Sequence, residues 1–285
     1  MKQLPGWLSP VWLVLGAIVT VQVGAAFAKS LFGLVDPTAV AWLRMAVAAL
    51  IFWAVARPRL AGRTWPEWRV VIGYGVTLAV MNWAIYQSFA RIPIGLAVTI
   101  EFLGPLGIAL FGSRRVRDLL WVGLAAVGVA LLGVLPTTVD WVGVGFALLA
   151  GAAWAGYILL SGPTGKAWEG VTGVSLGSLV GALVFLVPGV MAGGTAMWQP
   201  TVVLLAITVG ILSSVIPYGL EMIARRRIPA SVFGILMSLE PAAAALAGLL
   251  LLGEQLGTVE LVAMACVIVA SIGSTRALAV APAPN

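Results

Sequence analysis

Residues 91–105 read RIPIGLAVTIEFLGP, and residues 227–241 read RIPASVFGILMSLEP. Each stretch starts with Arg-Ile-Pro, continues as an apolar run and ends with proline, and the two copies lie 136 positions apart. Glu101 interrupts the first run and Glu240 the second. An apolar run of roughly 20 residues is long enough to cross a membrane. An ionisable group inside such a run is costly and usually functional.

The composition of the whole chain indicates an integral membrane protein. Hydrophobic residues make up 61% of the 285 positions and charged residues only 9%, which is more apolar surface than a water-soluble core requires. The apolar runs are continuous instead of alternating, so we expect helices and not a barrel. We predict an all-α integral membrane fold with ten transmembrane helices, over residues 10–32, 37–56, 68–89, 94–113, 117–135, 141–160, 171–191, 201–223, 230–252 and 257–276.

A further match supports an internal repeat of five helices. Residues 24–28 read GAAFA, and residues 151–155 read GAAWA. We therefore expect two five-helix repeats, residues 9–135 and 141–276. Because five is odd, the second repeat enters the membrane from the opposite side, and the repeats are inverted. Inverted repeats are typical of alternating-access carriers; an old duplication kept only for packing is the alternative.

The placement of the cations predicts the orientation. With both termini in the cytoplasm, the inner side collects 13 of the 16 Lys and Arg residues, in keeping with the bias of cytoplasmic loops toward positive charge. They are Lys2, Arg57, Arg59, Arg63, Arg69, Arg114, Arg115, Arg117, Lys166, Arg225, Arg226, Arg227 and Arg276. The net charge of +6 thus marks one membrane face, and we expect no nucleic-acid partner.

Several chemistries lack a sequence signal. The chain has no histidine, the commonest metal ligand and general base, and a single cysteine, Cys266. The run SGPTGK at residues 161–166 lacks the glycine spacing and the final Ser/Thr of a phosphate-binding loop. We therefore expect no enzyme activity, no catalytic residues, no metal and no cofactor.

Several segments carry a family resemblance: EFLGP at residues 101–105, PYGLEMIA at residues 217–224 and FGILMSLEP at residues 233–241. They make the chain similar to the drug/metabolite transporter superfamily, whose members carry two EamA domains of five helices. Within it the chain most resembles bacterial inner-membrane exporters of threonine and homoserine. This resemblance implies proton-driven export of small amino acids across the inner membrane.

Glu101 and Glu240 are the first candidates for binding substrate or protons. Pro105 follows Glu101 at i+4, so the two share a helix face, and the proline removes the backbone donor that would reach the carbonyl of Glu101. A neutral carboxyl hydrogen-bonded to a neighbouring helix is the alternative for Glu101. Glu240 directly precedes Pro241 and has a structural alternative of equal weight. Pro105, Pro241 and Pro217 are the expected kink or gating positions.

Basic and polar residues complete the predicted site. Arg44 can hold a substrate carboxylate or neutralise Glu101, and a purely structural ion pair is equally compatible with its position. Lys29 either binds substrate or extends to the lipid headgroups. Asn82, Tyr86 and Tyr218 can line a polar cavity or form hydrogen bonds between helices. The row Gly173, Gly177 and Gly181 favours close helix packing or a homodimer face.

The expected function is therefore a secondary active exporter of small neutral amino acids, with the amino acid, protons and the lipid bilayer as its partners. Export of other metabolites or drugs is the alternative within the superfamily. A non-transporting membrane scaffold is the alternative from another class of protein.

Overall fold

The computed structural model describes residues 10–111, 119–132 and 140–279, and within these ranges it contains helices and no strand. Seven helices are long and apolar enough to cross a membrane, and an eighth crossing results if two helices joined by a 54° bend form one span. The all-helical membrane architecture is confirmed. The predicted spans 94–113 and 117–135 fall on shorter helices in the described part of the chain.

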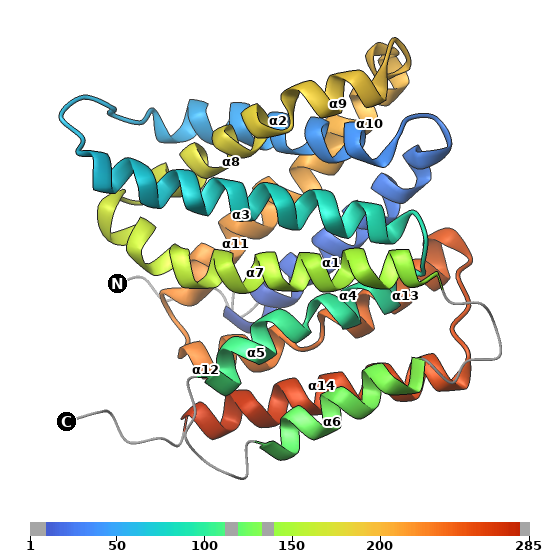
Figure 1. Ribbon diagram of the computed structural model, residues 1–285. Coiled ribbons are helices and arrows are strands. Elements are labelled where there is room, and N and C mark those ends of the chain that lie inside the picture. The colour runs from blue at the N-terminus through green and yellow to red at the C-terminus, as the bar shows by residue number, and fades with distance from the viewer. Residues whose placement is uncertain (1–9, 112–118, 133–139, 280–285) are drawn as a thin grey trace, which may run out of the picture.

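The first part of the chain forms six helices (Figure 1). They are α1 (Pro10–Ser30), α2 (Pro37–Ala56), α3 (Trp65–Phe89), α4 (Ile94–Glu101), α5 (Leu103–Phe111) and α6 (Leu119–Leu132). Asp36 caps α2 by accepting the N–H of Thr38 (2.7 Å). The cations Arg114, Arg115 and Arg117 of the predicted inner loop lie outside the described residues.

The second part forms eight helices: α7 (Trp141–Ala167), α8 (Thr172–Val184), α9 (Leu186–Gly193), α10 (Pro200–Gly210), α11 (Ile216–Arg225), α12 (Ala230–Met237), α13 (Glu240–Leu252) and α14 (Thr258–Ala279). The bent pair is α8 with α9. Between α10 and α11 the residues Ile211–Val215 form a π-helical turn. Turns of this kind interrupt helices mostly at functional positions.

Two helices are interrupted at matching places. Proline precedes both α4 and α12, at Pro93 and Pro229, with almost identical backbone angles, and each helix is eight residues long. Both then break, at Phe102 and at residues 238–239. Glu101 is consequently the last residue of α4, and Glu240 is the first residue of α13.

Small residues allow the helices to approach closely around these breaks. A Cβ atom on Gly151 of α7 would lie 2.7 Å from the carbonyl oxygen of Glu101, and one on Gly104 would collide with the carbonyl of Gly151. The backbone where α4 meets α5 thus lies directly on α7. The carbonyl of Glu101, which Pro105 leaves without its helical donor, faces this packed contact.

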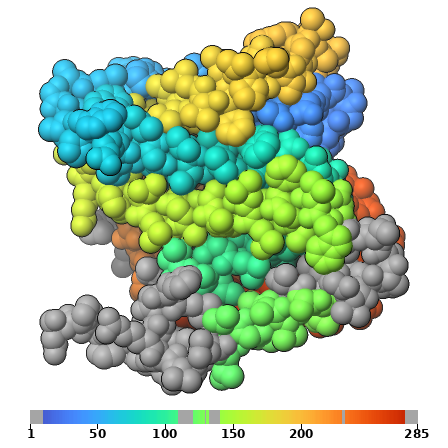
Figure 2. Space-filling view, in the orientation of Figure 1, coloured from blue at the N-terminus to red at the C-terminus, as the bar shows by residue number. Residues whose placement is uncertain are grey.

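The helices run roughly parallel in stacked layers (Figure 1). Helix α3 packs against α7 and α8, α2 packs against α8, and α6 packs against α14. Figure 2 shows α3, α7 and the pair α8–α9 covering one face of the molecule. A Cβ on Gly177 would lie 2.5 Å from the ring of Tyr74 in α3. The row Gly173, Gly177 and Gly181 therefore packs against neighbouring helices of the same chain and does not support a homodimer.

Candidate functional site

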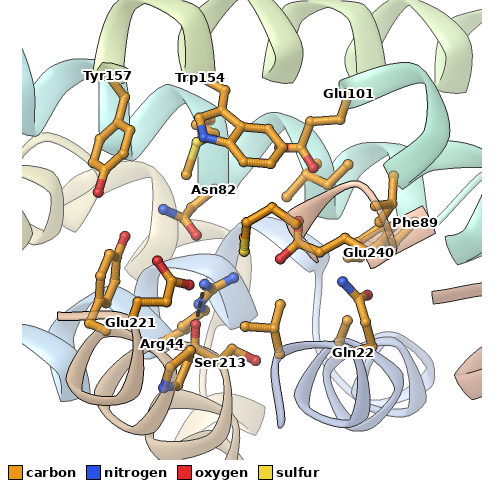
Figure 3. Close-up of a pocket in the computed structure, with 18 of the residues that line it drawn as sticks. Gln22, Arg44, Asn82, Phe89, Glu101, Trp154, Tyr157, Ser213, Glu221 and Glu240 are labelled. Atoms are coloured by element: carbon orange, nitrogen blue, oxygen red, sulfur yellow. Dashed lines mark hydrogen bonds between the residues drawn. The ribbon is translucent and has the colours of Figure 1, made fainter. Parts of the chain in front are cut away.

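A cavity of about 130 Å³ lies where the interrupted helices meet the middle of α1, α2, α3, α7 and α11. Its charged and polar lining is Gln22, Arg44, Asn82, Glu101, Tyr157, Ser213, Tyr218, Glu221, Arg225 and Glu240. Its apolar lining includes Met81, Ile85, Phe89, Trp154 and Met237. Figure 3 shows side chains from several helices pointing into this space.

The two predicted carboxyl groups share the cavity. Only 8% of Glu101 and 7% of Glu240 is exposed. Figure 3 shows both side chains directed into the same space, Glu101 from the end of α4 and Glu240 from the start of α13. Among the described residues the carboxyl groups that accept hydrogen bonds are those of Asp36, Glu67, Asp140, Glu221 and Glu254, and neither Glu101 nor Glu240 is one of them. Both oxygen pairs are thus available to a ligand or a proton.

Arg44 occupies the opposite wall and is held firmly in place. Its Nη2 donates to the carbonyl oxygen of Ser213 (2.7 Å), its Nε to Ser214 Oγ (3.1 Å) and its Nη1 to the hydroxyl of Tyr86 (3.4 Å). The guanidinium carbon also lies 5.5 Å from the ring centre of Tyr86. These contacts fix the orientation of the planar group, which is suited to carboxylate recognition.

Arg44 forms no direct ion pair with either acid. Ion pairs in the described parts of the chain join Lys29 to Glu254, Arg63 to Glu67, and Arg225 to Glu221. The alternative in which Arg44 is consumed by a structural ion pair with Glu101 is therefore wrong. The cation and the acids face each other across the cavity instead, because polar groups of α10–α11 and α3 hold Arg44.

The other predicted polar residues divide into two groups. Asn82 and Tyr218 line the cavity, although the Asn82 side chain also donates to the carbonyl of Leu78 in its own helix (2.7 Å). Tyr86 is fully buried and reaches the cavity only through its bond to Arg44. It acts as a support for the arginine and not as part of the lining.

Lys29 lies outside the cavity. Its Nζ is 2.7 Å from Glu254 Oε1 and donates to the carbonyl oxygen of Ile92 (2.9 Å). The interpretation in which Lys29 extends to lipid headgroups is wrong, because a carboxylate from the loop before α14 reaches it first. Glu254 was not predicted, and its separation from Lys29 along the chain leaves no local signal for the pair.

The three prolines lie in different surroundings. Pro217 lines the cavity at the start of α11, just after the π-helical turn. Pro241 is buried in the first turn of α13, beside Glu240. Pro105 lines a separate cavity of about 270 Å³ bounded by α5, α7, α12 and α14.

Sequence reasoning gave no role to several residues of the lining, Gln22 and Trp154 among them. Gln22 is a polar residue in the apolar run of α1, a signal that could have identified it. Trp154 gives no such signal, because a tryptophan in a membrane helix is compatible with many positions. It lines both the central cavity and the cavity beside Pro105, and its ring packs edge-on against Phe102, with ring centres 5.0 Å apart.

A larger cavity of about 360 Å³ adjoins the central one. Tyr157, Tyr218, Glu221 and Arg225 line both. The larger cavity extends to the ends of α7 and α11, where Trp168 and Arg226 lie. The central cavity is therefore continued toward the side of the molecule that carries the arginine run at positions 225–227.

Comparisons with known proteins agree with this architecture. The model of the EamA-like transporter family matches residues 141–276. The threonine/homoserine exporter RhtA of Escherichia coli (strain K12) is 45% identical over 280 residues, covering 96% of this chain and 94% of that protein. The exporter of the same name from Salmonella typhimurium (strain SL1344) is 43% identical over 279 residues, covering 96% and 93%.

A solved crystal structure shares the fold, with a TM-score of 0.63 at 21% identity over 96% of this chain and 99% of that one. The relatives are transporters, so the chain is a transporter and not an enzyme. The extent of the identity, along nearly the whole length of both proteins, establishes that the chain belongs to the RhtA family of the drug/metabolite transporter superfamily.

Proposed function

We propose that the protein exports small neutral amino acids, such as threonine and homoserine, across the bacterial inner membrane in exchange for protons. The observation that carries the proposal is the central cavity, which presents a fixed guanidinium opposite two carboxyl groups. An amino acid carries one carboxylate and one ammonium group, so this arrangement is complementary to its main chain. The sequence identity with exporters of threonine and homoserine supports the same substrate class.

Each end of the substrate has a partner in the cavity. Arg44 holds the carboxylate, and Glu101 or Glu240 receives the ammonium group. Met81, Ile85 and Met237 surround the remaining space with apolar atoms. The large rings of Phe89 and Trp154 also bound this space, so the cavity favours a short side chain.

Glu101 is the proposed proton carrier. A proton on its carboxyl and the ammonium group of the substrate compete for the same oxygens, so binding of one releases the other. Carboxyl groups inside membrane helices commonly serve as proton relays. Each positive charge that returns inward is worth about 2.3 kcal/mol per 100 mV of membrane potential, which is enough to drive moderate uphill export.

The halves 9–135 and 141–276 are proposed to be inverted repeats of five spans each. The helix contacts support this arrangement, because a contact between two helices has a counterpart between the corresponding helices of the other half. Helix α3 contacts α7 as α11 contacts α1, α5 contacts α7 as α13 contacts α1, and α3 contacts α8 as α10 contacts α2. The breaks after α4 and α12, 136 positions apart, agree with it. The substrate site then lies where the halves meet.

The proposed orientation places both termini in the cytoplasm. The described cations at the ends of α2, α7 and α11 support it. Arg63 donates to the carbonyl of Ala167 at the end of α7 (2.9 Å), and Arg225 and Arg226 line the larger cavity together with Gly165 of α7. The larger cavity extends to this side. Lys29 and Glu254 tie the helices together on the opposite side. The protein is therefore proposed to be closed outward, with its cavity approached from the cytoplasm.

Transport into proteoliposomes tests the proposal. Protein reconstituted with its cytoplasmic side facing outward should take up labelled threonine when a pH gradient is imposed across the vesicle membrane. We expect Glu101→Gln to abolish the part of this uptake that the pH gradient drives. Glu169→Gln is the control, since Glu169 is exposed and lines none of the three cavities. Absence of threonine flux in the wild type would reject the function. Unchanged pH-driven flux in Glu101→Gln would remove only Glu101 from the mechanism.

A further inference from the structure

We infer that Glu221 and Arg225 form a first recognition site, which receives the main-chain charges of an amino acid before the substrate reaches the buried cavity. The inference rests on the proposed function and adds a second binding step to it. It concerns a pair of side chains that the sequence alone presents as an ordinary ion pair within one helix.

The position of the pair is the first support. Glu221 Oε2 and Arg225 Nη2 lie 3.3 Å apart on successive turns of α11. Both residues line the central cavity and the larger cavity next to it, and Arg225 also lines the cavity beside Pro105. Any solute that passes from the larger cavity to the central one therefore meets this pair.

The chemistry of the pair suits a zwitterion. It places a carboxylate and a guanidinium side by side, so the ammonium group of an amino acid can bind Glu221 while its carboxylate binds Arg225. The Arg225 side chain is 54% exposed and that of Glu221 16%. The more exposed guanidinium is therefore open to the carboxylate of a ligand, while Glu221 lies deeper beside it.

Aromatic groups bound the same place. The guanidinium of Arg225 lies 4.3 Å from the ring centre of Phe233, which keeps it at the junction of the cavities. Tyr157 and Tyr218 line both the central and the larger cavity beside the pair. The charged pair therefore lies among aromatic rings where the two spaces meet.

The backbone links this pair to Arg44. Glu221 and Arg225 lie on α11, which continues directly from the π-helical turn at Ile211–Val215. That turn supplies the carbonyl of Ser213 and the hydroxyl of Ser214 that hold Arg44. A shift of α11 when a ligand binds the pair is therefore transmitted to the group that receives the substrate carboxylate next.

A second pair provides a matched control. Arg63 and Glu67 are also four residues apart, with Nη1 and Oε1 at 2.9 Å, and lie on the same side of the molecule. Neither residue lines any of the three cavities. Loss of this pair removes the same charges on the same side of the molecule without altering a side chain that lines a cavity.

The test measures export of threonine by Glu221→Gln, Arg225→Gln and the control variants Glu67→Gln and Arg63→Gln. Loss of one charge-assisted hydrogen bond to the substrate should raise KM about tenfold, with kcat nearly unchanged, in the α11 variants only. An unchanged KM, or the same rise in the control variants, overturns the inference. If the wild type exports no threonine, the proposed function fails instead.

A second measurement covers variants that fail to fold. Met222 lines the larger cavity beside Glu221. The substitutions Met222→Cys and Cys266→Ser together give a protein with a single cysteine at this position and leave Glu221 and Arg225 intact. Threonine should slow its labelling by a thiol reagent. N-acetylthreonine and threonine amide, which each lack one charge, should not slow it. Equal protection by all three compounds, or protection by none, overturns the inference.

Discussion

The ammonium nitrogen of Lys29 lies 2.7 Å from Glu254 Oε1 and joins the end of α1 to the loop between α13 and α14. The other carboxylate oxygen of Glu254 accepts the backbone N–H of Ile94 at the start of α4 (2.9 Å). Lys29 also donates to the carbonyl of Ile92 (2.9 Å). A single pair of charged residues thus connects α1, the start of α4 and the loop between α13 and α14 on the side opposite the larger cavity.

Removal of this connection should destabilise the described conformation. Glu254→Ala leaves the N–H of Ile94 and the charge of Lys29 without their partner, so we expect a loss of about 1–3 kcal/mol, measured by thermal unfolding in detergent. Glu254→Gln keeps an acceptor for the N–H of Ile94 and should recover part of it. Glu260→Ala is the control. A Glu254→Ala protein as stable as that control contradicts the role of the pair.

Arg44 should not tolerate replacement by lysine. Lysine keeps the charge but lacks the planar group that donates at once to Ser213 and Ser214. We expect Arg44→Lys to lower kcat/KM for threonine at least about tenfold, because one charge-assisted hydrogen bond to the substrate is worth that much. Tyr86→Phe removes only the 3.4 Å contact and should have a several-fold smaller effect. Equal activity of Arg44→Lys and wild type in the flux assay excludes carboxylate binding by Arg44.

The contact between α5 and α7 should depend on glycine. A methyl group at Gly104 collides with the carbonyl of Gly151, and an overpacked contact of this kind costs about 1–3 kcal/mol. Gly104→Ala should therefore unfold at a lower temperature than the wild type. Gly107→Ala lies in the same helix, where a Cβ meets no atom within 4 Å, and should be neutral. Similar melting temperatures of the two variants would show that α5 shifts without cost.

The helix ends were predictable from sequence where a proline fixes them. The predicted starts at residues 94 and 230 coincide with the starts of α4 and α12, because Pro93 and Pro229 lack the N–H that an earlier helical turn would need. The break at Phe102 lies next to Glu101, from whose carbonyl Pro105 removes the helical donor, so the sequence already indicated a kink here. The close packing of this break on Gly151, a residue of another helix, was not predicted, because no local pattern records that contact.

The candidate site was predictable only in part, for the same reason. Glu101, Glu240 and Arg44 stand out because charged groups are rare in apolar runs. Which of the other polar residues reach the cavity depends on how each helix is rotated. Lys29 and Tyr86 both lie in membrane helices, yet one joins Glu254 and the other supports Arg44. Only the packed structure distinguishes these roles from direct binding.

Trp154 should limit the size of the substrate. Its side chain forms part of the wall between the central cavity of about 130 Å³ and the cavity of about 270 Å³ beside Pro105. Trp154→Leu should open a connection between them, so that leucine competes with labelled threonine at least about tenfold better than in the wild type, as expected when an added apolar contact is worth 1–3 kcal/mol. Ile158→Ala enlarges only the cavity beside Pro105 and should leave the selectivity for threonine over leucine unchanged. If leucine competes equally with all three proteins, another residue sets the size limit.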